Sequence, residues 1–141
     1  MSKQKKKGTR FETLVADWLS ERTGCGVARR AQSGRNDKGD LIGLRLRGLT
    51  CCVECKDHAR ERLSEWREQT EIERGNSDSD IGLLVIHRPQ MGEARCGENW
   101  VELCAEDFAS LYFGVAAPAH PTARTVWVRT TLDELMEVCG R

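Results

Sequence analysis

The strongest constraint on the fold is a pair of strand-like runs, residues 40–46 and 49–56, separated by the dipeptide Arg47-Gly48. Two such runs with a glycine-containing turn between them predict an antiparallel hairpin. The ends of a hairpin that lie away from its turn are neighbours in space. We therefore expect Asp40, which begins the first run, to lie close to Glu54, which is near the end of the second.

The motif Glu54-Cys55-Lys56 closes the second run. Side chains alternate between the two faces of a strand, so Glu54 and Lys56 share one face while Cys55 points into a core. Two carboxylates can hold Mg²⁺, and a neighbouring cation can stabilise a reacting phosphate. Together with Asp40, the motif therefore indicates a metal-dependent phosphodiesterase. The alternative is an ordinary solvated strand face, on which charges also alternate.

The chain has 141 residues, which predicts one domain. A hydrophobic content of 39% and a charged content of 31% are typical of a soluble globular protein. No apolar run approaches the ~20 residues of a membrane span, and the start lacks a secretory signal. We expect a cytoplasmic protein without membrane contact, with a disordered basic arm at residues 1–8 and a single domain at residues 9–141.

The formal net charge of zero conceals an asymmetry along the chain. Residues 1–35 carry nine Lys and Arg against three Asp and Glu, a net charge of +6. A basic segment of this kind indicates a polyanionic partner. The lysines at residues 3–7, taken alone, are explained equally well as an aid to solubility.

Seven cysteines, an odd number, and no secretion signal predict free thiols in a reducing compartment. The spacing Cys52-x-x-Cys55 raises the alternative of a zinc-stabilised domain. A strand would place these two side chains on opposite faces, and no second C-x-x-C or H-x₃₋₅-H spacing follows. We interpret the cysteines as small buried hydrophobic residues.

Apolar residues at helical spacing predict a first helix at residues 9–23, where Thr9-x-x-Glu12 has the spacing of a capping box. From that spacing alone, capping is the expected role of Glu12. The further expected elements are a short strand at 27–31, a charged helix at 59–74, a buried strand at 81–87, a strand at 99–104, a helix at 105–112, a strand at 126–128 and a final helix beginning near Thr131. This order predicts an α/β fold with a mixed central sheet flanked by helices.

Several motifs in this order resemble the PD-(D/E)xK nuclease superfamily, most closely its Holliday junction resolvases of archaeal type. They are Gly8-x-x-Phe11-Glu12, Arg30-Ala31-x-Ser33-Gly34, Gly39-Asp40-Leu41-Ile42, Val53-Glu54-Cys55-Lys56 and Arg67-Glu68-Gln69. The resemblance runs through most of the chain and implies a restriction-endonuclease-like fold. Gly39 stands where many relatives have proline. The small size and compact motifs would suit a bacteriophage protein, which would act in the cytoplasm of the host cell.

The resemblance implies a catalytic set and a cofactor. The catalytic residues would be Glu12, Asp40, Glu54, Lys56 and Gln69. Mg²⁺, with Mn²⁺ as a substitute, would be held by Glu12, Asp40, Glu54 and the carbonyl of Cys55. Lys56 would orient a water or stabilise the pentavalent phosphate, and Gln69 would help to position the reacting groups.

The resemblance also implies the partner, branched DNA in the form of a four-way junction. DNA would be contacted by Lys5, Lys6, Lys7, Arg10, Arg29, Arg30, Ser33, Gly34 and Arg35. A junction has approximate two-fold symmetry and needs two nicks, so we expect a C₂ homodimer, with Trp127 and the final helix as candidate contacts. The alternatives are a nuclease for duplex, flap or single-stranded DNA, and a DNA-binding module without catalysis.

Overall fold

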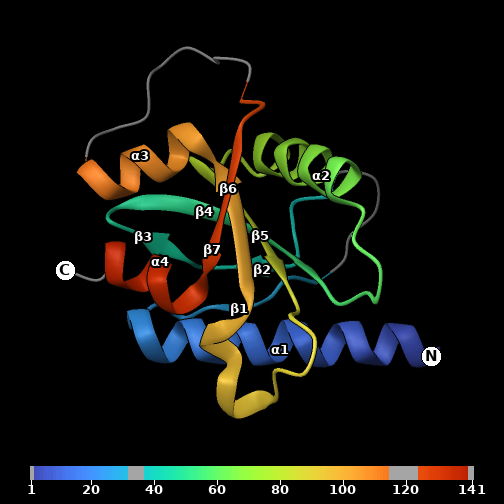
Figure 1. The fold of residues 1–141 in the computed structure, drawn as a ribbon. Helices are drawn as coiled ribbons and strands as arrows, with labels where there is room; N and C mark the ends of the chain where they lie inside the picture. Colours follow the sequence, from blue (N-terminus) through green and yellow to red (C-terminus); the bar gives the residue numbers. More distant parts are fainter. Residues whose placement is uncertain (1, 32–36, 115–123, 140–141) are drawn as a thin grey trace.

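The structure is a computed structural model that describes residues 2–31, 37–114 and 124–139. The elements in chain order are α1 (Lys3–Thr23), β1 (Ala28–Arg29), β2 (Leu41–Ile42), β3 (Arg45–Leu46), β4 (Leu49–Lys56), α2 (Leu63–Asn76), β5 (Ile81–Ile86), the 3₁₀ helix η1 (Glu93–Glu98), β6 (Trp100–Cys104), α3 (Ala105–Phe113), β7 (Trp127–Thr131) and α4 (Leu132–Cys139). The start of α1 and the end of α4 lie on opposite sides of the molecule (Figure 1).

The strands of the described residues form one seven-stranded sheet in the order β1-β2-β4-β5-β6-β7, with β3 paired to β4. Strands β4 and β5 are parallel, and the other neighbouring pairs are antiparallel. The parallel connection is made by α2, which crosses over one face of the sheet, as a parallel pair requires. The predicted α/β fold with a mixed sheet between helices is therefore confirmed.

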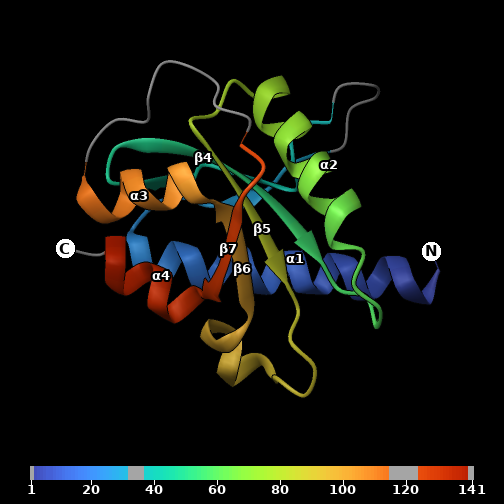
Figure 2. The same ribbon diagram turned by 45° about the horizontal axis from the view of Figure 1, so that its top comes forward.

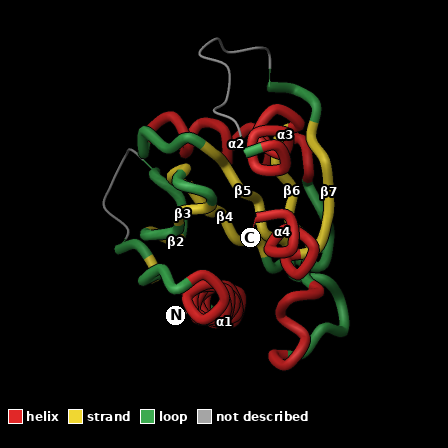
Figure 3. Tube along the Cα trace, turned by 90° about the vertical axis from the view of Figure 1, so that its left-hand side faces the viewer, coloured by secondary structure: helices red, strands yellow, loops and turns green. Residues whose placement is uncertain are grey.

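The two faces of the sheet have different coverings. On one face, Val53 and Cys55 of β4 join a core built with α1, α3 and α4. On the other face, Trp66 of α2 packs against Leu84 and Ile86 of β5. The view in Figure 3 shows α1 and α2 on opposite sides of the sheet. Because β4 and β5 are covered on both faces, their ends can carry side chains into a site that is partly shielded from water.

The predicted hairpin is present, but its first strand is interrupted between β2 and β3. Leu41 pairs with Val53, and Arg45 pairs with Thr50. Between the pair Leu41–Val53 and the pair Arg45–Thr50, the first strand contains one residue more than its partner, which defines a β-bulge.

The bulge decides which face Asp40 occupies. Gly43 lies within it with a φ of 101°, and a Cβ there would overlap the carbonyl oxygen of Gly26. Only glycine combines this backbone conformation with so close an approach. Without the extra residue Asp40 would lie opposite Cys55, whereas the observed register places it opposite Glu54.

The prediction of a disordered arm at residues 1–8 is wrong for the described part, because α1 begins at Lys3. The Ser2 hydroxyl caps the helix by accepting a hydrogen bond from the Lys5 N–H at 3.1 Å. Gln4 then donates to the Asp57 carbonyl oxygen at 2.9 Å, and Lys7 lies 3.3 Å from the Asp57 carboxylate. These contacts hold the basic segment against the body of the protein, where it forms the first turns of α1.

Smaller differences concern the second helix and the cysteines. The helix expected at residues 59–74 begins at Leu63 and ends at Asn76. All seven cysteines are free thiols. Cys55 joins the core with α1, whereas the Cys52 thiol donates toward the Lys38 carbonyl oxygen at 3.4 Å. Because these two cysteines lie on opposite faces of β4, as predicted, their sulfurs cannot bind one ion.

The structure offers no candidate for a membrane-spanning helix among the residues it describes. The division of the chain into domains stays a prediction.

Candidate active site

A hollow of about 230 Å³ lies where the C-terminal end of β4 approaches α1 and α2. We call it the carboxylate hollow; it is lined by Gln4, Gly8, Glu12, Asp37, Asp40, Glu54, Cys55, Lys56, Asp57, His58 and Gln69. Figure 2 shows the end of β4, the following loop and the first half of α1 on the same side of the molecule. All five residues predicted to be catalytic therefore line one hollow, although they come from separate parts of the chain.

Asp40 is fixed beside β4 by its own side chain. Its Oδ2 accepts a hydrogen bond from the Cys55 backbone N–H at 2.9 Å, and its backbone N–H donates to the Val53 carbonyl oxygen at 2.8 Å. These bonds and the bulge hold the Asp40 carboxylate next to that of Glu54. The proximity predicted from the hairpin is thereby confirmed.

Glu54 is almost completely buried, with 2% of its surface exposed. Its Oε2 lies 3.3 Å from the Lys56 ammonium, while its Oε1 has no hydrogen-bond partner among the described residues. Burial, followed by the charge of Asp40, raises the pKa of Glu54 well above its ordinary value. The site thus holds a buried carboxylate oxygen that a cation could satisfy.

Glu12 lies on the side of α1 that faces the hollow. Its Oε1 is 3.1 Å from Nε of Arg29. Burial, and next the charge of Asp40, raises the pKa of Glu12. The prediction of a capping box is wrong, because Thr9 lies inside α1 and the helix is capped at Ser2. Glu12 is therefore available to the hollow.

Gln69 leads to a residue that the sequence analysis missed. Its side-chain amide donates to Oε1 of Glu73 at 3.0 Å. Glu73 is 1% exposed, and no described residue forms a hydrogen bond with its Oε2. Burial is the largest cause that raises the pKa of Glu73, and the charge of Asp37 is the next. The Glu54 side chain also interacts with Glu73. The available signal was spacing, because Glu73 follows Trp66 and Thr70 along the buried stripe of α2.

The donor set fits a hard divalent cation. No group of three His, Cys, Asp or Glu side chains in the described part of the chain is already gathered as a metal site. Glu12 and Glu54 are instead paired with Arg29 and Lys56. Mg²⁺ needs only one or two carboxylates besides waters. The unpaired Glu54 Oε1 and the neighbouring Asp40 carboxylate therefore match its chemistry.

The residues predicted to contact DNA have different surroundings. Lys7 and Arg29 are engaged by the carboxylates of Asp57 and Glu12. Arg30 is partly buried, and within the part of the chain that the structure describes its Nε has no hydrogen-bond partner. Lys5, Lys6 and Arg10 on α1 are exposed, and so are Lys7 and Arg29 despite their ion pairs. Three others lie outside the described residues, namely Ser33, Gly34 and Arg35.

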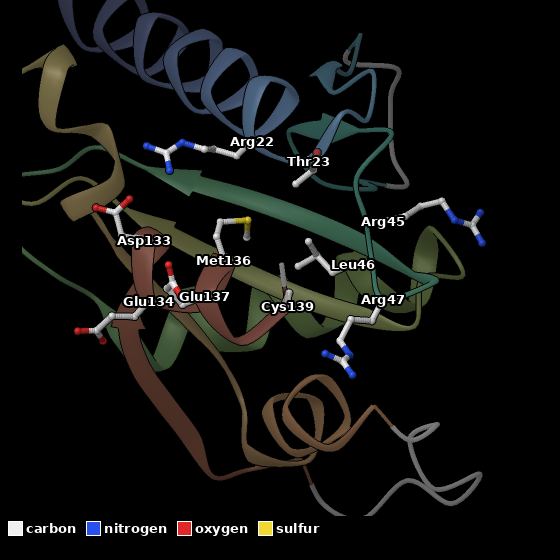
Figure 4. A pocket seen from close by; sticks show the side chains of 10 residues that line it. All are labelled: Arg22, Thr23, Arg45, Leu46, Arg47, Asp133, Glu134, Met136, Glu137 and Cys139. Carbon is white, nitrogen blue, oxygen red and sulfur yellow. The ribbon is translucent and has the colours of Figure 1, made fainter. Parts of the chain in front are cut away.

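A larger hollow, of about 610 Å³, lies between the end of α1, the β3–β4 turn and α4. In Figure 4, Arg45 and Arg47 lie at one side of it, and the carboxylates of Asp133 and Glu134 lie at the other. It contains none of the predicted catalytic residues. The smaller carboxylate hollow is the better candidate for chemistry, because it gathers acids, a lysine and a buried unpaired carboxylate oxygen.

Comparison with known proteins identifies the family. Neither the curated proteins nor the solved structures gave a match. A family model described as "Phage putative PDDEXK endonuclease" matches residues 3–134, a span that contains every residue predicted to be catalytic. The mixed sheet flanked by helices agrees with the PD-(D/E)xK fold. The chain therefore belongs to this phage family of PDDEXK endonucleases.

Proposed function

We propose that the protein is a Mg²⁺-dependent DNA endonuclease that resolves four-way junctions by paired, symmetric nicks. The observation that carries the proposal is the gathering of Glu12, Asp40, Glu54, Lys56 and Gln69 around one hollow. Membership of an endonuclease family supports the hydrolytic part of it. The choice of a junction as substrate rests on the resemblance of the motifs to junction resolvases.

Asp40, Glu54, Glu12 and the Cys55 carbonyl would hold the ion, which is Mg²⁺ or, as a substitute, Mn²⁺. A bound divalent ion supplies Lewis-acid polarisation of the phosphate. The ammonium of Lys56 is held 3.3 Å from Glu54 and would stabilise the charge that develops on the pentavalent phosphate. The burial of Glu54 keeps competing water from this carboxylate and strengthens its interactions with cations.

Gln69 would position the reacting groups from α2. Its amide is oriented by the hydrogen bond to Glu73 at 3.0 Å, so its direction is set before substrate arrives. Pre-orientation of this kind reduces the entropy that binding must remove.

The DNA backbone would cross the face of the hollow beside the first turns of α1. The basic residues proposed to bind phosphates are Lys5, Lys6, Lys7, Arg10, Arg29, Arg30 and Arg35, with Ser33 and Gly34 touching the strand near the cut. If about six phosphates are neutralised, the affinity should fall with salt with a log–log slope near −5. Phosphate contacts carry no sequence information, so the shape of the DNA would select the target.

Two cuts on opposite strands require two sites related by two-fold symmetry. We propose a C₂ homodimer, with Trp127 and α4 as candidate contacts. Trp127 lies on the edge strand β7 and is only partly buried. Sedimentation equilibrium of the protein alone and bound to a junction would measure the stoichiometry, and a 1:1 complex of protomer and junction would exclude the dimer.

The decisive experiment compares a labelled four-way junction with linear duplexes of the same sequence in Mg²⁺. Symmetric nicks in the junction, with little cutting of the duplex, support the proposal. Equal cutting of both, or a preference for flap or single-stranded DNA, would indicate a nuclease with another substrate. DNA binding without cleavage, or cleavage that survives Glu54→Gln, would contradict the catalytic site itself.

A further inference from the structure

A third hollow, of about 340 Å³, adjoins the carboxylate hollow at the start of α2. We call it the arginine hollow; it is lined by Lys56, His58, Ala59, Arg60, Arg62, Glu65 and Trp66. Lys56 and His58 line both hollows. The two spaces are therefore neighbours that share a wall, and this wall contains the proposed catalytic lysine.

The arginine hollow carries an excess of positive charge. Lys56, Arg60 and Arg62 line it together with one acid, Glu65, and even with Lys56 paired to Glu54 the two arginines outnumber that acid. Arg62 lies 4.0 Å from Glu65, and both side chains of this ion pair are exposed. Among the described residues, Arg60 forms no ion pair. An exposed pair at this distance contributes little, so both guanidinium groups are available to an anion.

One wall of the arginine hollow is a buried, well-packed side chain. Trp66 is 4% exposed and packs against Leu84 and Ile86 of the sheet. The His58 ring lies over it, with 5.6 Å between ring centroids. The first turn of α2 also opens here without a side-chain cap at Arg62, so its N–H groups add to the positive field. A buried tryptophan and two exposed arginines lining one hollow suit a phosphate held at one position.

We propose that the arginine hollow binds one backbone phosphate of the cut strand, adjacent to the phosphate that is cleaved. This inference rests on the proposed nuclease function. Arginine is suited to this ligand because its planar guanidinium can donate two parallel hydrogen bonds to phosphate oxygens. Since the two hollows share Lys56, a phosphate held by Arg60 and Arg62 sets the direction in which the strand crosses the carboxylates.

The test is a cycle between protein and DNA. Methylphosphonates, which remove one phosphate charge, are placed singly at each position within two nucleotides of the cut. The kcat/KM of cleavage is measured for the wild type, for the double variant Arg60→Ala with Arg62→Ala, and for Arg22→Ala. Arg22 is the control because it is an exposed arginine in the last turn of α1, at the other end of that helix from Lys7.

For the wild type and for Arg22→Ala, we expect neutralisation at one adjacent position to lower kcat/KM about tenfold, a typical cost for a charged contact. The double variant should cut unmodified DNA about tenfold more slowly, and the same neutralisation should then cost it less than about twofold. Far-UV circular dichroism would establish that the variant is folded.

Equal losses at every position in the wild type and the double variant would overturn the arginine hollow as a phosphate site while leaving the nuclease intact. Failure of the wild type to cut any DNA would be a different result, because it would overturn the proposed function and this inference with it.

Discussion

Gly8 offers a substitution that separates catalysis from stability. It lies within α1, where glycine is about 1 kcal/mol less favourable than alanine. It lines the carboxylate hollow one turn before Glu12, and a Cβ built on it meets no atom of the described residues within 4 Å. A side chain at this position would extend into open space above the carboxylates. We infer that glycine leaves the entrance open for a DNA strand.

Gly8→Leu should therefore raise the free energy of unfolding by roughly 0.8 kcal/mol, the difference in helix propensity between the two residues. The melting temperature should rise by roughly 2–5 °C for a chain of this size. The leucine side chain would occupy part of the hollow of about 230 Å³, and single-turnover cleavage should fall at least tenfold. Stability and activity would then move in opposite directions, which a folding defect cannot produce.

Gly8→Ala is the matched control. Its single methyl group gives about 1 kcal/mol of helix propensity and fills little of the hollow, so cleavage should remain near that of the wild type. Thermal unfolding and single-turnover cleavage of the same preparations measure both quantities. Wild-type cleavage by Gly8→Leu would refute the reasoning, because the substrate would then not pass over this side of α1.

Three further results are expected. Gly43→Ala should lower the free energy of unfolding, measured in urea, by about 3 kcal/mol, because it adds overlap with Gly26 to the cost of a positive φ. Gly48 has a φ of 82° but open space around it, so Gly48→Ala should lower the same free energy by only about 1–2 kcal/mol. Equal losses in the two variants would contradict a tightly packed bulge. Glu102→Gln should lower the free energy of unfolding by about 2 kcal/mol, because the buried carboxylate accepts hydrogen bonds at 2.7 Å from both Arg67 and Arg129. An unchanged urea midpoint would show that these two hydrogen bonds contribute nothing to stability. EDTA should abolish DNA cleavage by the wild type, and added Mg²⁺ should restore it. Asp40→Asn should stay inactive at any Mg²⁺ concentration. Cleavage in the presence of EDTA would rule out the metal-dependent mechanism.

The parts of the site that the sequence predicted follow from local rules. Alternation along a strand places Glu54 and Lys56 on one face, and a hairpin brings Asp40 to them. Both rules depend only on residues close in the sequence, and the structure confirms the resulting contacts at β4. The pairing of Asp40 with Glu54 nevertheless needs the bulge at Gly43, which depends on packing against Gly26 and could not be read from the hairpin alone.

The misjudged features depend on contacts between distant segments. Residues 3–8 have the composition of a solvated arm, but the contacts of Gln4 and Lys7 with Asp57 hold them as helix. Glu73 was missed because a buried carboxylate is contrary to the usual behaviour of glutamate on a helix. Arg29 has a neighbour that the sequence did not predict, because it pairs with Glu12, and its contact with DNA stays a prediction. For residues 3–8 and for Arg29 the partner lies far along the chain, whereas Glu73 is bonded by Gln69 of its own helix.

The central claim is that the carboxylate hollow holds a divalent cation. The most direct test is a titration of the DNA-free protein with Mn²⁺, in which electron paramagnetic resonance measures the bound ion. If Asp40 and Glu54 form a divalent cation site, the wild type binds the ion, and both Asp40→Asn and Glu54→Gln weaken that binding at least tenfold. Asp17→Asn, which removes an exposed acid of α1, leaves it unchanged. Equal Mn²⁺ affinity in all four proteins would mean that the carboxylate hollow does not hold the metal.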